Sequence, residues 1–414
     1  MGLSEDLAWR GLIKDKTFEK KEWLDEPKKF YLGIDASADS LTIGNLAVLM
    51  LARRLLEAGW QAVLLAGGAT SLVGDPGGKE EERQLQAKEE IAKNIEGVRS
   101  QIEKLFAGKP HEMVNNLDWL GEVRYLDFLR DIGKHYPMTE LMQREFVDTR
   151  MGESGSGISY AEFSYSLLQG YDFWHLFANQ GVVMQIGASD QWGNMLSGVA
   201  LIRKKEAREA QAFSMPLVFN KATGKKFGKS EEGAVWLDAN RTSVYKFYQF
   251  WFNTADDDAI DYLKVFTLLG RDDINGLAKA QKDNPSDRPA QKRLAYEVTA
   301  LVHGEDQAKR QEHIAKVLFG GGQLSELDDS ELGSIRDEVA SVKIQPGTPV
   351  VEALVKAGLA ASNSEGRRLA EGKAIYVNNQ QFVKDHLESA DFQNGRLLLR
   401  RGKSFKDSAL VELD

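Results

Sequence analysis

The hydrophobic and polar positions of the chain alternate between two patterns over roughly the first 230 residues. Short apolar runs stand at 30–34, 61–66, 182–186 and 215–219, each bounded by Gly, Asp or Pro. Such runs are typical of buried parallel strands. Longer stretches with helical spacing lie between them. Strands that alternate with helices predict an α/β fold, namely a doubly wound parallel sheet with ligands outside the carboxyl ends of its strands.

Residues 85–150 interrupt this alternation with mostly helical segments, for example 89–106 and 125–136. The interruption is rich in large apolar side chains: Leu117, Trp119, Leu120, Tyr125, Leu126, Phe128, Leu129 and Phe146. Because these residues lie outside the sheet pattern, they need another surface to cover them. We therefore expect a homodimer built on a helical insertion at about 110–160.

The pattern changes again after residue 242, where it becomes helical and charged as far as 319 and then breaks at Gly320–Gly322. An acidic stretch at 325–338 indicates a linker or a short helix. Residues 348–414 form a further unit with expected helices at 350–359 and 364–371, strands at 375–377, 396–400 and 409–413, and a tight turn at Asn378-Asn379.

Composition excludes several classes of protein. The 414 residues contain no run of 18 uncharged apolar residues, so we expect no membrane partner. Cysteine is absent, which excludes disulfides and thiolate metal sites and suits a cytoplasmic location. The six histidines show no metal-ligand spacing, so no structural metal is expected. The net charge of −9 means that a nucleic-acid partner would need a local basic surface.

Two runs carry the candidate chemistry. Residues 30–45 indicate a buried strand, a polar turn and the start of a helix, whose free N–H groups attract anions while Gly44 lets a nucleotide approach closely. The run Lys226–Ser230 adds two lysines and a hydroxyl. Together they suggest a site that holds a nucleoside triphosphate from both sides.

Five stretches, taken in order, resemble bacterial tyrosyl-tRNA synthetase, a class I aminoacyl-tRNA synthetase. They are 30–45, which resembles the tyrosine strand and the H-x-G-H signature, 67–76, 163–173, 185–194, and 226–230, which resembles the K-M-S-K-S loop. The C-terminal unit resembles the small RNA-binding module that this family shares with a ribosomal protein.

The resemblance implies a domain plan and a reaction. The plan is a Rossmann-like catalytic domain at 1–235, a helical anticodon-binding domain at 236–322, a linker at 323–347 and a ribosomal-protein-like module at 348–414. The reaction joins L-tyrosine and ATP into tyrosyl-AMP, releases pyrophosphate and transfers tyrosine to the 3′ end of tRNA(Tyr). Mg²⁺ is expected with ATP as a substrate complex, without a tightly bound cofactor, since no carboxylate cluster for a fixed metal is evident.

A tyrosine pocket can be read from the residues themselves. Tyr165, Gln169 and Asp172 are spaced i, i+4 and i+7, which places them on one face of a helix. The resemblance implies that Tyr31 and Asp172 bind the substrate phenol, and that Asp75, Tyr165 and Gln169 bind its ammonium. It also implies that Gln185 lies near the bound tyrosine and Gln191 near its carboxylate. Phenylalanine would leave the phenol-binding groups unpaired.

For the nucleotide, the resemblance implies contacts from Gly33, Asp35, Ser37, Gly44, Gly187, Asp190 and Lys229. Asp190 is expected at the ribose and also suits the N-cap of the next helix. Lys226 and Lys229 suit the leaving pyrophosphate, and Lys79 and Arg83 are candidates for further phosphate contacts. The catalytic set is completed by Thr42 and Asn45, where the family usually has histidine. These two departures weaken the expected phosphate stabilisation.

In the C-terminal unit a local basic patch is the candidate RNA contact: Arg367, Arg368, Lys373, Arg400, Arg401 and Lys403. Two other functions remain open at this point. One is a non-catalytic RNA-binding relative that has kept the fold, which Thr42 and Asn45 invite. The other is the related tryptophan enzyme, which does not need the Tyr31/Asp172 pair.

Overall fold

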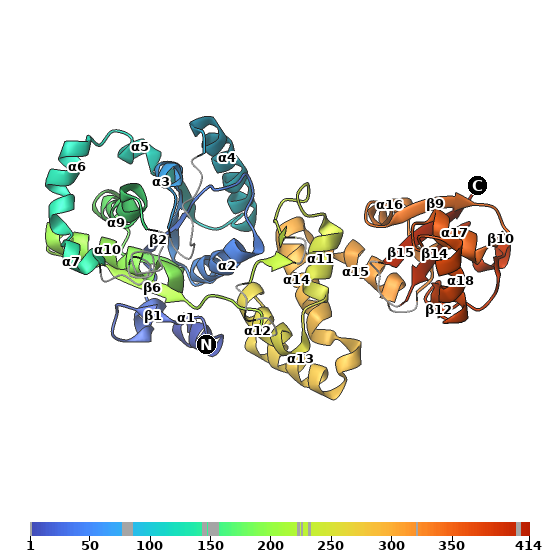
Figure 1. Cartoon of the computed structure of the whole chain (residues 1–414). Helices are drawn as coiled ribbons and strands as arrows, with labels where there is room; N and C mark the ends of the chain where they lie inside the picture. The colour runs from blue at the N-terminus through green and yellow to red at the C-terminus, as the bar shows by residue number, and fades with distance from the viewer. Residues whose placement is uncertain are drawn as a thin grey trace. The chain divides into compact units, whose positions relative to one another are not determined.

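The computed structural model describes residues 2–76, 86–142, 147, 157–221, 224, 227–230, 233–319, 322–402 and 407–414. The chain divides into two compact units, Met1–Val302 and His303–Asp414 (Figure 1). Within the described helices, none is long and apolar enough to cross a membrane.

The first unit is built on a six-stranded sheet in the order β1-β6-β5-β2-β3-β4. Its strands are β1 (Asp15–Lys16), β2 (Lys29–Ile34), β3 (Gln61–Ala66), β4 (His111–Asn115), β5 (Met184–Ala188) and β6 (Gln211–Met215). All neighbours are parallel except β1, which pairs antiparallel with β6. The doubly wound sheet is therefore confirmed. Its winding reverses between β2 and β5, where such folds bind ligands.

The strand boundaries differ from the sequence pattern at one side of the sheet. Strands β2 and β3 match the apolar runs at 30–34 and 61–66, but β6 ends at Met215, where a run at 215–219 was expected to begin. Pro216 follows directly, and a proline has no N–H to extend the ladder. Strand β4 was not expected, because three of its five side chains are polar and most are half-buried, so it has no buried apolar run.

Helices surround this sheet and then continue as a helical region (Figure 1). Those near the sheet are α1 (Leu3–Trp9), α2 (Ile43–Glu57), α3 (Gly68–Val73), α4 (Lys88–Leu105), α5 (Leu117–Leu120), α6 (Tyr125–Asp131), α7 (Met138–Met142), α9 (Tyr160–Gln180) and α10 (Trp192–Glu206). The helical region holds α11 (Val244–Phe252), α12 (Asp256–Phe266), α13 (Arg271–Asp283) and α14 (Pro289–His303).

Helix α9 is fixed closely against its neighbours. It begins with a capping box in which Ser159 and Glu162 satisfy each other's backbone N–H groups, and Gly181 ends it in the left-handed conformation. A Cβ at Gly198 of α10 would lie 2.6 Å from the ring of the buried Phe173. The glycine therefore allows the two helices to approach, and this contact sets the position of the predicted pocket face.

The second unit packs helices on a five-stranded sheet in the order β12-β11-β14-β15-β9. Its elements are α15 (Glu305–Phe319), α16 (Asp329–Arg336), β9 (Ala340–Ile344), β10 (Thr348–Pro349), α17 (Val350–Lys356), α18 (Asn363–Glu371), β11 (Ile375–Val377), β12 (Gln380–Gln381), β13 (His386–Leu387), β14 (Arg396–Arg401) and β15 (Ser408–Leu413). Asn378 and Asn379 both have positive φ, 49° and 69°, which is the turn expected between β11 and β12.

The unit begins earlier than the sequence pattern suggests. The stretch at 323–347, expected as a linker, contains α16 and also β9, which pairs in parallel with β15. Helix α15, expected with the helical domain, belongs to this unit. Strand β9 was not predicted because most of its side chains are exposed, so it lacks the buried apolar run by which strands are recognised in a sequence.

Candidate active site

The candidate site lies where β2 and β5 meet the face of α9. Tyr31 on β2 is directly paired with Gln185 on β5, and both are 1% exposed. A Cβ at Gly33 would lie 3.0 Å from the Tyr31 hydroxyl, so a side chain at that position would crowd the phenol. Gly33 therefore has a steric reason to be glycine.

The predicted face of α9 is confirmed as buried. Tyr165, Gln169 and Asp172 are 6%, 8% and 1% exposed, although all three carry polar groups. Buried polar groups need hydrogen-bond partners. The partners of Asp172 and Tyr165 come from other elements, which bring distant parts of the chain together at this face.

A continuous chain of hydrogen bonds joins the carboxylates of Asp172 and Asp35. Asn116 Nδ2 donates to Asp172 Oδ2 at 2.9 Å and to Thr70 Oγ1 at 3.1 Å. Thr70 Oγ1 donates in turn to Asp35 Oδ1 at 2.7 Å. The Tyr165 hydroxyl donates to Asp35 Oδ2 at 2.8 Å. The carboxylates of the two expected subsites, phenol and nucleotide, are thus held by one network.

Three residues that donate hydrogen bonds around Asp172 and Asp35 were not predicted from the sequence. Trp119 Nε1 donates to Asp172 Oδ1 at 2.8 Å, whereas its large apolar ring placed it in the expected dimer surface. Thr70 lay within a quoted motif without a role, and Asn116 carried no signal in its own neighbourhood. Their function depends on the position of α5 and α3 against α9, which a local pattern does not contain.

Burial dominates the electrostatics of this pocket. It raises the pKa of Asp172 from 3.8 to about 7, although the bonds from Asn116 and Trp119 favour the ionised form. Burial also raises the pKa of the Tyr31 phenol well above 10, with further contributions from the charges of Asp172 and Asp35. Tyr31 is therefore a neutral O–H donor near neutral pH, beside a carboxyl group that can titrate there.

The second half of the site lies after β5. Gln191 Nε2 donates to Asp75 Oδ2 at 2.6 Å, and Asn194 Nδ2 donates to Gln191 Oε1 at 3.3 Å. The structure therefore brings Asp75 and Gln191 together, 116 residues apart in sequence. Gly187 is buried and Asp190 is exposed. Gln185 Oε1 is buried and finds no partner within the described part of the chain, so a bound ligand has an acceptor to satisfy.

Thr42 and Asn45 form a hydrogen-bonded pair at the start of α2. Both the backbone N–H and the Oγ1 of Thr42 donate to Asn45 Oδ1, at 3.0 and 2.9 Å. Because the carbonyl oxygen of Asn45 accepts both bonds, its NH₂ group remains as the donor toward an anion. Ser37 and Gly44 are exposed nearby in the sequence, and Asp35 is half-buried. The two residues that replace the expected histidines are thus hydrogen-bonded to each other.

The lysine run is only partly described. The backbone of β7 (Lys229–Ser230) pairs with β8 (Gly233–Ala234), and a Cβ at Gly228 would lie 3.5 Å from Gly44. This contact brings the run beside the first turn of α2, as expected. Lys79, Arg83, Lys226 and the side chain of Lys229 lie outside the described residues.

The residues of the expected basic patch in the second unit divide into two groups. Arg367, Arg368 and Lys373 are exposed on or just after α18. Arg400 is only 6% exposed and donates to Asn379, and Arg401 pairs with Glu365 and Asp407 at 3.3 and 3.1 Å. Lys403 lies outside the described residues.

Comparison with known proteins agrees with this geometry. A family model described as tRNA synthetases class I (W and Y) matches residues 24–320. The chain therefore belongs to the class I tRNA synthetases for tryptophan and tyrosine. A model of the tyrosine–tRNA ligase SYY-like C-terminal domain matches residues 331–406. Within that class the chain groups with the tyrosine–tRNA ligases and is an enzyme of that kind.

The most informative relatives are tyrosine enzymes. A tyrosine–tRNA ligase of Staphylococcus saprophyticus is 43% identical over 412 residues, which is 97% of each chain. The solved structure of a C-terminally truncated mitochondrial tyrosyl-tRNA synthetase of Aspergillus nidulans is 31% identical, with a TM-score of 0.69 over 77% of this chain and 94% of that one. The corresponding Coccidioides posadasii structure is 29% identical, with a TM-score of 0.65 over 76% and 91%.

The raised pKa of Asp172 predicts a pH-dependent stability. In the folded chain the carboxyl group of Asp172 keeps its proton up to about pH 7, whereas in the unfolded chain the same group loses its proton near pH 4. The free energy of unfolding should therefore fall as pH rises through this interval. Asp172→Asn cannot titrate, so its stability relative to the natural chain should increase from about pH 4 to about pH 7 and then level off.

Chemical denaturation at several pH values measures this difference. Trp119→Phe should move the levelling-off to higher pH, because it removes a bond that favours the ionised carboxylate. Parallel stability curves for the natural chain and Asp172→Asn would contradict the assignment.

Proposed function

We propose that this chain activates L-tyrosine with ATP, releases pyrophosphate, and transfers the tyrosyl group to the 3′ end of tRNA(Tyr), through the site between β2, β5 and α9. The observation that carries the proposal is the buried pair of Tyr31 and Asp172, a neutral O–H donor near a carboxylate, with Tyr31 packed in an apolar cluster. Such a pair matches a phenol, which both donates and accepts a hydrogen bond.

The tyrosine ligand then has a definite direction in the pocket. Its phenol meets Tyr31 and Asp172, and its ring lies along the apolar cluster that contains Phe173 and Val63. Its ammonium lies toward Asp75, Tyr165 and Gln169, which supply acceptors. Its carboxylate lies toward Gln191, near the nucleotide. The buried Oε1 of Gln185 is satisfied by the bound amino acid or by a water held with it.

The nucleotide lies over the carboxyl ends of β2 and β5. The exposed backbone at Gly33 and Gly44 allows close approach, the Gly44 N–H at the start of α2 faces the phosphates, and Asp190 and Gly187 meet the ribose. Asp35 and Ser37 complete this side. Mg²⁺ enters as the ATP complex. In the described part of the chain no three His, Cys, Asp or Glu gather into a metal site of their own.

The reaction needs placed charge and no covalent enzyme intermediate. The tyrosine carboxylate attacks the α-phosphorus and pyrophosphate leaves, so negative charge moves onto the leaving oxygens. Lys226 and Lys229 are proposed to meet that charge, with Lys79 and Arg83 as further contacts. Thr42 orients Asn45, whose NH₂ group is a neutral donor at the same place, so the pair stabilises the charge less than protonated imidazoles would.

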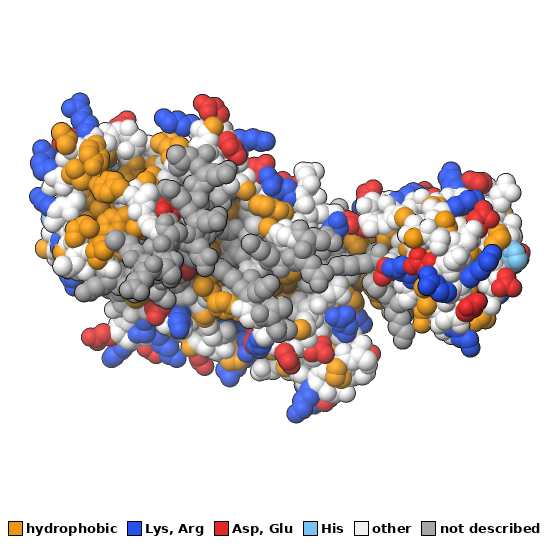
Figure 2. All heavy atoms as spheres, in the orientation of Figure 1, with side chains coloured by type: hydrophobic (Ala, Val, Ile, Leu, Met, Phe, Trp, Pro, Cys, Tyr) orange, Lys and Arg blue, Asp and Glu red, His pale blue; other side chains and the backbone are white. Residues whose placement is uncertain are grey.

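The homodimer is proposed from an apolar surface on the helical insertion. Hydrophobic side chains gather over this region in Figure 2, and exposed residues of α5 to α9 form the patch: Leu117, Tyr125, Leu126, Leu129, Met138, Met142 and Tyr160. An exposed apolar patch of this extent usually marks an interface. Phe146, also expected in this surface, lies outside the described residues.

Binding of tRNA is proposed to involve the second unit. Arg367, Arg368 and Lys373 are the exposed members of the expected basic patch and can reach phosphates directly, whereas the buried Arg400 and the ion-paired Arg401 support the local structure. The reducing cytoplasm, where tRNA is charged, suits a chain without cysteine.

The two alternative functions have less support. A non-catalytic relative has no use for a buried phenol-binding pair and an unsatisfied Gln185 beside it. A tryptophan enzyme would place an indole, which donates one hydrogen bond and accepts none, against the carboxyl of Asp172 and the O–H of Tyr31. The hydroxyl of Tyr31 would then lack an acceptor in its own site.

Loss of either phenol partner should erode discrimination against phenylalanine. Tyr31→Phe should cost tyrosine about 0.5–1.5 kcal/mol of binding free energy, and Asp172→Asn about 1.5–3 kcal/mol, while phenylalanine gains or stays level. Amino-acid-dependent ATP–pyrophosphate exchange measures both substrates in each variant. An unchanged tyrosine/phenylalanine ratio in both variants would show that the phenol lies elsewhere.

Restoring histidine should strengthen phosphate stabilisation. Thr42→His should keep or raise the rate of tyrosyl-AMP formation, since Thr42 is half-exposed and an imidazole reaches further than a hydroxyl. Thr42→His/Asn45→His should raise it more, by up to about tenfold, which corresponds to about 1.4 kcal/mol. Single-turnover kinetics with parallel melting curves measure this. A large rate loss at unchanged melting temperature would mean that the Thr42–Asn45 pair is itself the better arrangement.

The apolar patch predicts the oligomeric state. The natural chain should sediment as a dimer at micromolar concentration, and Leu126→Glu should shift it toward monomer, because it places a charge in the proposed interface. Val383→Glu is the matched control, since Val383 is 74% exposed and Leu126 is 75% exposed. Val383 belongs to the second unit, so its variant should remain dimeric. A monomeric natural chain would exclude this interface.

A further inference from the structure

The ring of Phe227 lies among four aromatic side chains of the helical region. Its centroid is 4.7 Å from that of Tyr262, 5.1 Å from Phe266, and 5.5 Å from both Phe250 and Trp251. The four come from α11 and α12, and we call them the aromatic cage. Phe227 itself belongs to the lysine run, two residues before Lys229. A half-buried loop residue is thus held by ring contacts on four sides, which is unusual for a surface loop.

The backbone beside Phe227 contacts the start of α2. A Cβ at Gly44 would lie 3.6 Å from the Phe227 carbonyl oxygen, and one at Gly228 would lie 3.5 Å from the backbone of Gly44. Gly228 is buried with φ of 125°, a conformation that other residues rarely adopt. Val235 N–H donates to the Gly228 carbonyl at 3.3 Å, and Ile43 N–H donates to the Val235 carbonyl at 3.0 Å. The segment is therefore held between the aromatic cage and the first turn of α2.

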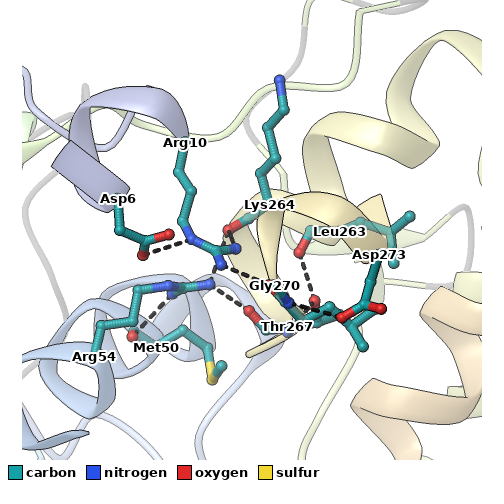
Figure 3. A network of polar contacts seen from close by, with 10 residues as sticks. Asp6, Arg10, Met50, Arg54, Leu263, Lys264, Thr267, Gly270 and Asp273 are labelled. Carbon is teal, nitrogen blue, oxygen red and sulfur yellow. Dashed lines mark hydrogen bonds and ion pairs between the residues drawn. The ribbon is translucent and has the colours of Figure 1, made fainter. Parts of the chain in front are cut away.

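The last turn of α2 and the C-terminal end of α12 are joined by the buried Arg54, beside a second buried arginine, Arg10 (Figure 3). Arg54 of α2 donates to the carbonyls of Lys264 and Thr267. Arg10, the residue that follows α1, donates to the carbonyls of Lys264 and Leu269 at 3.0 and 2.6 Å. The end of α12 carries the negative end of its helix dipole, which favours these cations. Asp6 pairs with Arg10 at 2.8 Å.

Arg54 remains a cation in this setting. Burial lowers its pKa to about 9, so the guanidinium is still protonated at neutral pH. Its side chain makes a third bond to the Met50 carbonyl at 3.0 Å within its own helix. A planar fork that satisfies carbonyls on two helices fixes their relative position more closely than apolar packing alone does.

We propose that Phe227 is a positioning residue for the activation step: its ring, seated in the aromatic cage, sets the backbone of Gly228 and Lys229 against Gly44, and Arg54 holds the cage at the distance that makes this contact. The inference rests on the proposed function, because it supplies the placement of a group that acts on the leaving phosphates. It assigns to α11 and α12 a role in the first chemical step, in addition to any contact with tRNA.

The physical argument is one of geometry. The first turn of α2 and the lysine run meet the same phosphates, so their separation decides whether both sets of donors reach the transition state at once. The described contacts form a closed circuit from Gly44 to Phe227, to the cage on α12, to Arg54 and back along α2. A misplacement of about 1 Å at a reacting group can cost about 100-fold in rate. Tyrosine contacts none of these residues in the proposed pocket.

Phe227→Ala tests the proposal through a separation of rate from binding. The single-turnover rate of tyrosyl-AMP formation should fall about 10- to 100-fold, while the dissociation constant of tyrosine without ATP stays within about twofold. Phe227→Leu keeps part of the apolar contact and should recover most of the rate. Phe18→Ala is the matched control, because Phe18 is a buried ring stacked on Trp23 at 5.1 Å, packed against strand β6 and not on the lysine run. It should lower stability without changing the rate of the folded enzyme.

A double-mutant cycle tests the part of Arg54. Arg54→Lys should lower the same rate and leave tyrosine binding intact, since lysine cannot span the carbonyls of both helices. Because both residues act on one placement, the combined Phe227→Ala/Arg54→Lys loss should be clearly smaller than the product of the single losses. A combined loss equal to the product of the two single losses would separate Arg54 from the proposal.

The outcomes distinguish this inference from the proposed function. If the natural chain forms no tyrosyl-AMP, the proposed function fails. If the natural chain is active and Phe227→Ala, shown folded by its melting curve, is equally active, the positioning role is overturned. Equal losses of rate and tyrosine binding, or an equal rate loss in Phe18→Ala, would also overturn it. Should Phe227→Ala not fold, Phe227→Val, whose smaller side chain leaves most of the cage contact unmade, decides by the same comparison of rate with tyrosine binding.

Discussion

The site depends on how the buried carboxylate of Asp172 is held. A carboxylate taken out of water is costly unless hydrogen bonds replace its hydration. Asn116 and Trp119 supply those bonds to its two oxygens. Asn116 continues through Thr70 to Asp35, and Asp35 receives the hydroxyl of Tyr165. One requirement, the satisfaction of a buried acid, therefore orders α3, α5, α9 and the end of β2 around a single pocket.

That requirement also explains the balance of charge in the pocket. The bonds from Asn116 and Trp119 favour the ionised acid, yet burial is the larger effect and leaves the pKa of Asp172 near 7. A substrate phenol that donates to this group supplies a further bond to the ionised form. Binding of the right amino acid and ionisation of Asp172 then support each other, whereas a phenyl ring leaves the acid without that bond. Selectivity follows from burial, which makes an unpaired group costly.

Much of this arrangement could be predicted from the sequence. The runs of β2 and β3 and the spacing of Tyr165, Gln169 and Asp172 depend on local periodicity, and the structure confirms them. The features that could not be predicted depend on contacts between distant segments of the chain. The parallel pairing of β9 with β15, the bond from Trp119 to Asp172, and the inward position of Arg400 each follow from tertiary packing. The mutual bonding of Thr42 and Asn45 also became visible only in three dimensions, although the two residues are three apart.

The most direct test of the account is a crystal structure of the natural chain with L-tyrosine bound. The account predicts that the phenol oxygen lies about 2.6–3.2 Å from both the Tyr31 hydroxyl and a carboxylate oxygen of Asp172, with the ammonium toward Asp75 and Tyr165. A tyrosine bound with its phenol away from Tyr31 and Asp172, or bound outside the pocket between β2, β5 and α9, would contradict it.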